Sequence, residues 1–103
     1  MKPLIKPKDC DSIKEIRDAI DVIDTELLKL LEQRNDYVKE IVKFKNSDEK
    51  GIIAQERKEL VLEQRKKWAE ERGLDAEMIE GIFRLLIDKN IQIQLDISNS
   101  NNK

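Results

Sequence analysis

The chain has 103 residues, of which 39% are hydrophobic and 41% are charged, and its net charge is −2. This length and apolar content allow one domain with a modest core. The even mixture of charge signs argues against nucleic acid as a partner, because phosphate binding needs a surplus of positive charge. There is no apolar run of about 18 residues and no signal-like start, so we expect no membrane association and a cytoplasmic location.

Several residues on which enzymes depend are missing. The sequence has no histidine, the usual general base and commonest metal ligand. Its three glycines form no phosphate-binding loop. We therefore expect no metal and no cofactor, and an enzyme built on this chain would act through electrostatics and shape. Cys10 is the single cysteine, which excludes an intrachain disulfide, and we interpret it as an ordinary residue near the N-terminus.

The first predicted helix is very long. Ser12 and Glu15 have the spacing of a capping box, which indicates a helix start after an extended segment that holds both prolines. Neither proline nor glycine follows before Lys45, so the helix is predicted to run to about that residue, roughly 50 Å at 1.5 Å per residue. Apolar residues recur along it at helical spacing: Ile13, Ile16, Ile20, Ile23, Leu27, Leu30, Leu31, Val38, Ile41 and Phe44.

Two shorter helices are predicted after a loop at residues 46–51. The second spans about 53–71, and Gly73 ends it as a C-cap. Asp75 then caps a third helix that runs to about Ile97. Polar residues from Ser98 onward are predicted to be disordered, which leaves 1–98 as a single helical domain and 99–103 as a tail.

Each of the shorter helices has a predicted inner face. On the second helix this face consists of Leu60, Val61, Gln64 and Trp68. On the third helix it consists of Met78, Ile79, Ile82, Phe83, Leu86, Ile87, Ile91 and Leu95.

These elements predict an all-α fold with three helices per subunit. A helix of about 50 Å is too long for two shorter helices to cover in a compact monomer of this size. We therefore expect a two-fold homodimer with antiparallel long helices, in which each copy buries the apolar stripe of the other. The alternative is a helical hairpin with a protruding arm.

Three cations lie on or beside the apolar stripe of the long helix: Arg17, Arg34 and Lys45. A buried charge is costly without a partner, and the stripe holds no acidic residue, so the missing partner could be an anionic ligand. Each cation also has an ordinary explanation. Arg17 can pair with Asp21 one turn later, Arg34 can extend to water, and Lys45 favours the helix dipole.

Helical geometry separates the three cations. Arg34 and Lys45 are eleven residues apart, which leaves them within roughly 20° of one face and about 16 Å apart along the axis. They can bracket one small molecule. Arg17 lies roughly 25 Å from Arg34 and can reach such a site only from the other subunit of an antiparallel dimer. Two arginines suit carboxylates, which they bind with forked geometry.

The third helix adds two amides. Gln94 follows Ile87 and Ile91 at helical spacing, which predicts an inward position, and Asn90 lies one turn earlier. A buried glutamine needs partners for both its oxygen and its NH2 group. A ligand oxygen and a structural hydrogen bond are equal alternatives for Gln94.

At these residues the chain resembles the all-helical chorismate mutase family, and within it most closely the isochorismate-pyruvate lyases. The matching stretches are IRDAIDVID at 16–24, LLEQR at 30–34, KFK at 43–45, WAEERGLDA at 68–76 and EGIF at 80–83. The resemblance covers about residues 9–95 and implies an intertwined dimer of three-helix subunits.

The resemblance also implies roles for the candidate residues. Arg34, together with Arg17 from the partner chain, would bind the two substrate carboxylates. Lys45 and Gln94 would contact the ether oxygen of the breaking bond. Arg57 matches a further family arginine near the site, although a solvated helix charge is the alternative, and we count Asn90 among the candidate substrate-binding residues.

The choice between lyase and mutase depends on the second helix. Typical bacterial mutases have an acidic residue three positions before the matching arginine and another just after it. Here those positions are Ala54 and Lys58. Lys58 is unusual in either class and could point to solvent. The third helix has Asp88, Lys89 and Asn90 where the lyases often have aromatic residues.

The resemblance therefore leads to an isochorismate-pyruvate lyase that forms salicylate and pyruvate by a pericyclic reaction without base, nucleophile or metal. The alternative is a chorismate mutase that converts chorismate to prephenate in the same pocket. A third possibility, from a different class, is a helical dimerisation or regulatory module without catalysis.

Overall fold

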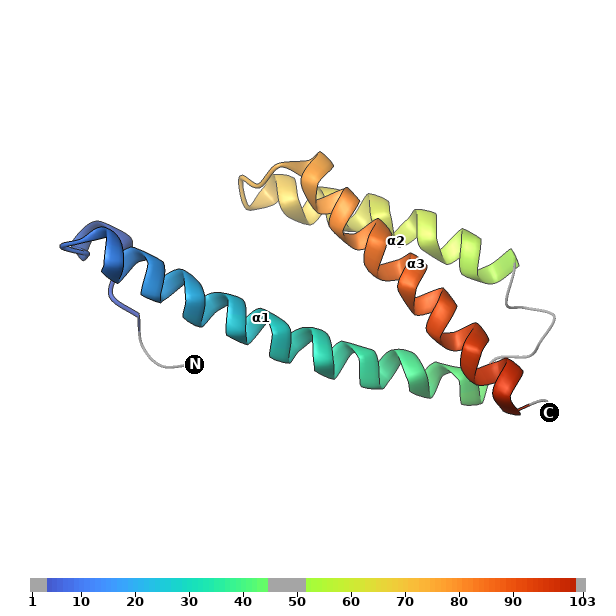
Figure 1. The fold of residues 1–103 in the computed structure, drawn as a ribbon. Helices are drawn as coiled ribbons and strands as arrows, with labels where there is room; N and C mark the ends of the chain where they lie inside the picture. The colour runs from blue at the N-terminus through green and yellow to red at the C-terminus, as the bar shows by residue number, and fades with distance from the viewer. Residues whose placement is uncertain (1–3, 45–51, 102–103) are drawn as a thin grey trace. The chain divides into compact units, whose positions relative to one another are not determined.

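The computed structural model describes the backbone of residues 4–44 and 52–101, and the side chains of 4–44 and 57–97. This part of the chain holds three α-helices and no strand: α1 (Ile13–Ile41), α2 (Ile52–Glu71) and α3 (Ala76–Asn101) (Figure 1). Short 3₁₀ turns lie at Pro7–Asp9 and Val42–Phe44. The predicted all-α class with one long N-terminal helix is confirmed. Backbone contacts group the chain into two compact units, Met1–Asp36 and Tyr37–Lys103.

The start of α1 is the predicted capping box. The hydroxyl of Ser12 accepts a hydrogen bond from the backbone N–H of Glu15 at 3.1 Å. The Glu15 carboxylate reaches back and accepts from the N–H of Asp11 at 2.9 Å. Both side chains therefore satisfy backbone N–H groups that a helix start leaves without internal partners.

The end of α1 differs from the prediction. The α-helix stops at Ile41, and Val42–Phe44 form a 3₁₀ turn. Helices often tighten in this way at their C-terminus, where the last carbonyls lack α-helical donors. The predicted α-helical spacing therefore holds only to Ile41. Lys45 and the predicted loop 46–51 lie outside the described residues.

The apolar stripe of α1 is exposed along the Met1–Asp36 unit. None of the residues described in this unit is buried, and Ile13, Leu27 and Leu30 expose 66%, 52% and 60% of their surface. A contiguous apolar stripe of this kind is characteristic of an interaction surface.

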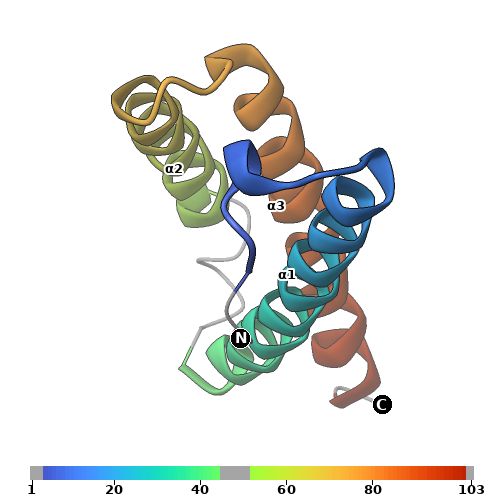
Figure 2. The ribbon, with the colours of Figure 1, turned by 90° about the vertical axis from the view of Figure 1, so that its left-hand side faces the viewer.

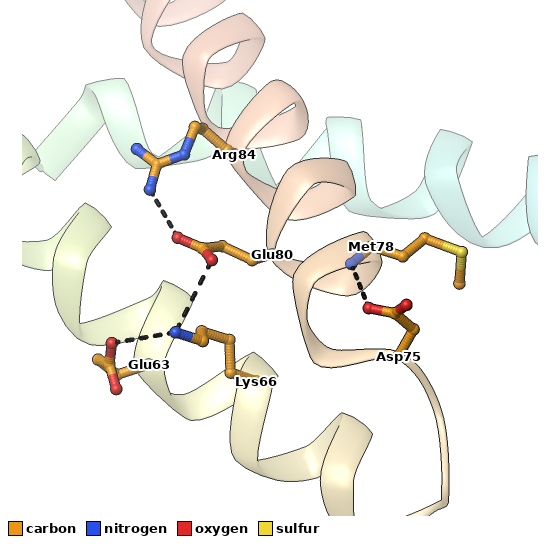
Figure 3. Close-up of polar contacts among 6 residues, drawn as sticks. All are labelled: Glu63, Lys66, Asp75, Met78, Glu80 and Arg84. Atoms are coloured by element: carbon orange, nitrogen blue, oxygen red, sulfur yellow. Dashed lines mark hydrogen bonds and ion pairs between the residues drawn. The ribbon is translucent and has the colours of Figure 1, made fainter.

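A tight turn joins α2 to α3. Gly73 adopts φ +69°, a left-handed conformation that favours glycine, and confirms the predicted C-cap. Its N–H donates to the carbonyl of Glu70 at 3.1 Å, and the N–H of Leu74 donates to that of Ala69 at 2.8 Å, a Schellman pattern. The Asp75 carboxylate accepts from the N–H of Met78 at 3.0 Å and caps α3 as predicted (Figure 3).

The helices α2 and α3 lie side by side and enclose the core (Figures 1 and 2). Val61, Leu62 and Ile87 form the buried cluster, with Phe83 and Ile91 packed against it. The predicted inner face of α3 is confirmed at its centre, whereas Met78, Ile82 and Leu95 are exposed.

The inner face predicted for α2 is correct only at Val61. Leu60, Gln64 and Trp68 are exposed, whereas Leu62 and Ala69 are buried. Apolar residues at helical spacing lie on two adjacent faces of this helix, one with Leu60 and Trp68 and the other with Leu62 and Ala69. Packing against α3 buries the face that contains Leu62.

Polar contacts cross the α2–α3 pair nearer the turn. The Lys66 ammonium lies 3.8 Å from carboxylate oxygens of both Glu63 and Glu80. Arg84 donates to the Glu80 carboxylate at 2.8 Å (Figure 3).

The C-terminal end of α3 also differs from the prediction. The helix continues to Asn101, beyond the predicted end near Ile97, and its backbone includes residues that we assigned to a disordered tail. No glycine or proline follows Gly81 in the sequence, so no backbone signal stops the helix.

Candidate active site

Arg34 is the candidate residue with the most unusual environment. Its side chain is half-buried on α1, and its Nη1 atom is shielded from solvent with no hydrogen-bond partner among the described residues. Burial lowers the pKa of the Arg34 guanidinium below its ordinary value. A guanidinium presents N–H donors in a planar fork that matches a carboxylate. The ordinary explanation, in which Arg34 extends fully to water, does not fit this burial.

Arg17 and Arg57 are both exposed. Asp21 lies one turn after Arg17, but no ion pair joins the two described side chains, and the exposed position of Arg17 agrees with the ordinary explanation that it extends to water. Arg57 lies near the start of α2 and forms no ion pair within the described residues. Both guanidinium groups therefore remain available in these units to bind an anion.

Gln94 joins α3 to the end of α1. Its Nε2 atom donates a hydrogen bond to the backbone carbonyl of Val38 at 3.1 Å, and the side chain is half-buried. Val38 lies in the last turn of α1. The structural hydrogen bond that the sequence left open for Gln94 is therefore present. The amide nitrogen of Gln94 carries two hydrogens, and the bond to Val38 uses one of them. It therefore also fixes the direction of the other N–H bond.

Asn90 lies one turn before Gln94 on α3 and is half-buried. A difference of four residues places the two amides within about 40° of one another around the helix axis. The two predicted amides therefore share a face of α3.

An ion pair that the sequence reasoning missed lies on the other side of α3. The Lys58 ammonium is 2.7 Å from a carboxylate oxygen of Asp88, and the Lys58 side chain is only 14% exposed. The expectation that Lys58 could point to solvent is wrong. Its position one turn before buried Val61 and Leu62 is a signal for its burial, but nothing local identifies Asp88 as its partner.

The candidates belong to different units of the chain. Arg17 and Arg34 lie in Met1–Asp36, whereas Arg57, Asn90 and Gln94 lie in Tyr37–Lys103. Lys45, predicted to be catalytic, is outside the described residues. The described candidates carry guanidinium and amide groups, which are donors suited to anionic oxygens.

Two further observations concern the described part of the chain. No three His, Cys, Asp or Glu side chains gather there in a group that could hold a metal ion. None of its helices is both long enough and apolar enough to cross a membrane.

Comparison with known proteins identifies the class. A sequence model of the family described as chorismate mutase type II matches residues 16–95. The chain therefore belongs to the type II chorismate mutase family, which is a family of enzymes. The resemblance drawn from the sequence is confirmed.

Particular relatives divide between two activities. The isochorismate pyruvate lyase of Pseudomonas aeruginosa is 45% identical over 89 residues, covering 86% of this chain and 87% of that protein. The chorismate mutase of Methanocaldococcus jannaschii is 32% identical over 84 residues, covering 82% of this chain and 85% of that protein. The T-protein of Haemophilus influenzae is 34% identical over 74 residues, and the match spans 72% of this chain but only 20% of that protein.

Proposed function

We propose that this protein is an isochorismate-pyruvate lyase, which cleaves isochorismate to salicylate and pyruvate. The observation that carries the proposal is the 45% identity to the Pseudomonas aeruginosa isochorismate pyruvate lyase over 86% of this chain and 87% of that protein. The identity to the Methanocaldococcus jannaschii chorismate mutase is lower, at 32%.

The reaction is balanced without any added group. A ring hydrogen moves to the methylene carbon of the enolpyruvyl side chain while the ether C–O bond breaks, and the ring becomes aromatic. Salicylate and pyruvate together hold all the atoms of isochorismate. The protein needs to hold the reactive conformer and stabilise charge that develops on the ether oxygen. A chain without histidine is suited to this chemistry.

In this proposal one carboxylate of the substrate binds Arg34 of one subunit, and the other binds Arg17 of the partner subunit. Nη1 of Arg34 has no hydrogen-bond partner within the described part of the chain, which supports the first contact. Lys45 and Gln94 stabilise the ether oxygen, while Arg57 and Asn90 contact the rest of the substrate. No cofactor takes part.

A second copy of the chain is required by this arrangement. The exposed stripe of α1 supports an antiparallel dimer, since burying it on its own copy removes a large apolar area from water. Analytical ultracentrifugation is expected to give twice the chain mass. A monomer at concentrations that support full activity contradicts the dimeric site.

Chorismate mutase activity is the second candidate, favoured by the family match itself. The residues around Arg57 favour the lyase, because typical mutases have acidic groups where this chain has Ala54 and Lys58. Lys58 is also engaged by Asp88 at 2.7 Å.

Purified protein given each substrate separately decides between them. We expect salicylate fluorescence from isochorismate with a higher kcat/KM than prephenate formation from chorismate. A higher kcat/KM for chorismate than for isochorismate would identify the protein as a mutase. If neither substrate gives a product, the protein is a helical module without catalysis.

A further inference from the structure

We propose that Lys58 and Asp88 form a positioning pair that sets how α3 presents Asn90 and Gln94 to the substrate. The inference rests on the proposed function for its kinetic consequence. It concerns an ion pair that connects α2 to α3 and has no place in the roles assigned above.

The pair lies one helical turn beyond the apolar core. Lys58 precedes the buried residues Val61 and Leu62 by three and four positions, and Asp88 directly follows buried Ile87. The Lys58 side chain is 14% exposed and that of Asp88 is 51% exposed. The ammonium is therefore drawn into the helix pair, while the carboxylate sits at its edge. Arg84, one turn before Asp88, is already bonded to Glu80 at 2.8 Å.

A second connection acts on the same stretch of α3. Gln94 bonds to the Val38 carbonyl at 3.1 Å, six residues after Asp88. Six residues correspond to about 240° of rotation and about 9 Å of rise along a helix. The two contacts therefore hold α3 on different faces and at different heights.

Two such contacts restrict the rotation of a helix about its axis, which one contact cannot do. Asn90 lies between them in the sequence and shares a face with Gln94 to within about 40°. When the Lys58–Asp88 contact is removed, α3 keeps the Val38 bond and the packing of Ile87 and Ile91 but loses a polar contact that opposes its rotation, so the amide face can turn. A displacement of about 1 Å at a catalytic group is enough to lower a rate markedly.

Methionine is the informative replacement for Lys58. It has a similar length and no charge, so it fills the same space, and the half-exposed Asp88 carboxylate can be hydrated when its partner is lost. Removing one partner of an ion pair is strongly destabilising where the remaining charge stays buried, but the Asp88 side chain is 51% exposed. Lys58→Met therefore separates positioning from folding, and Lys66→Met is a matched control, because Lys66 pairs with Glu80 across the same two helices at 3.8 Å.

We expect Lys58→Met to lower kcat/KM about tenfold, mainly through kcat, with a melting temperature within a few degrees of the wild type. Lys66→Met is expected to stay within about twofold of the wild type. Lys58→Arg keeps a cation that can reach Asp88 and is expected to retain most activity, whereas Asp88→Asn is expected to lose as much as Lys58→Met. The assay uses whichever of isochorismate and chorismate the wild type converts.

A readout independent of turnover accompanies the kinetics. The side-chain amide resonances of Gln94 in a nitrogen-15 NMR spectrum are expected to shift in Lys58→Met and stay in place in Lys66→Met. If the wild type converts neither substrate, the proposed function fails, and these resonances alone decide the positioning role. The inference is overturned if Lys58→Met leaves the Gln94 resonances unchanged or keeps activity within twofold of the wild type. It is also overturned if Lys66→Met loses as much activity, or if Lys58→Met does not fold.

Discussion

The side-chain amide of Gln94 donates a hydrogen bond of 3.1 Å to the backbone carbonyl of Val38, 56 positions earlier in the sequence. The bond connects the C-terminal half of α3, where Gln94 lies, to the last turn of α1. A residue that we propose to contact the substrate therefore also connects two helices.

Gln94→Glu tests this contact through its pH dependence. An ionised carboxylate has no hydrogen to donate to the Val38 carbonyl, so we expect the free energy of unfolding at pH 7 to fall by about 1–3 kcal/mol. The folded state favours the protonated acid, which raises the pKa of Glu at this position above its unfolded value of about 4.3. The lost stability is therefore recovered below about pH 4 and disappears again as the pH rises through the raised folded pKa.

Urea unfolding of this variant at pH 4 and pH 7, each compared with the wild type, gives the measurement. Gln33→Glu, at an exposed position on α1, is the control and should show no comparable pH-dependent difference. Equal behaviour of the two variants contradicts a structural role for the Gln94 bond.

Lys45→Ala is expected to reduce kcat by about 10²–10³-fold, since removing one donor to a developing oxyanion has an effect of this size. The dimer should still form, because the side chain is assigned to the substrate and not to packing. Lys43→Ala is the matched control, as Lys43 pairs with Glu40 at 2.7 Å on the exposed surface. Steady-state kinetics of both variants, with ultracentrifugation, give the test, and near-normal turnover by Lys45→Ala contradicts its assigned role.

Arg34→Met is expected to lower kcat/KM by about 10²-fold or more, because methionine cannot bind a carboxylate. The same change removes a partly buried cation whose Nη1 has no partner among the described residues, so the melting temperature without substrate should not fall. Lys39→Met, which removes an exposed cation from the same helix, should leave the kinetics unchanged. A large loss of thermal stability in Arg34→Met would indicate that Arg34 holds the fold and not a ligand.

Mixing two inactive variants tests whether Arg17 acts across the dimer. After joint refolding of Arg17→Ala and Arg34→Ala chains in equal amounts, about half of the dimers contain one chain of each kind. Each such heterodimer has one site with Arg34 of the first chain and Arg17 of the second, and one site with neither. We therefore expect about a quarter of the wild-type activity. If both arginines serve a site within one chain, no intact site forms and the mixture stays inactive.

Two glycines are expected to respond to alanine in opposite directions. Gly73 has φ +69°, and a Cβ there meets no atom within 4 Å, so the cost of Gly73→Ala is conformational. It should lower the free energy of unfolding by about 1–2 kcal/mol. Gly81 lies inside α3 with equal space around it, and Gly81→Ala should raise the free energy of unfolding by about 0.5–1 kcal/mol. Chemical denaturation measures both, and a stabilised Gly73→Ala protein contradicts the capping role of Gly73.

The sequence alone predicted the features that depend on neighbouring residues. The capping box of Ser12 and Glu15, the C-cap at Gly73 and the N-cap at Asp75 all form as expected. Each involves backbone and side-chain groups only a few positions apart, so local geometry is sufficient to specify it. The family was also evident from short stretches of sequence along the chain.

The tertiary structure decided the features that depend on contacts between distant residues. Packing against α3 selected Leu62 over the neighbouring apolar row of α2, because both rows have helical spacing and only the partner surface distinguishes them. The Lys58–Asp88 and Gln94–Val38 contacts join residues 30 and 56 positions apart, and no periodic pattern specifies such pairs. The shielding of Arg34 Nη1, which has no hydrogen-bond partner among the residues that the structure describes, likewise depends on the surrounding side chains. Local sequence thus determined where the helices begin and turn, and long-range packing determined which polar groups meet.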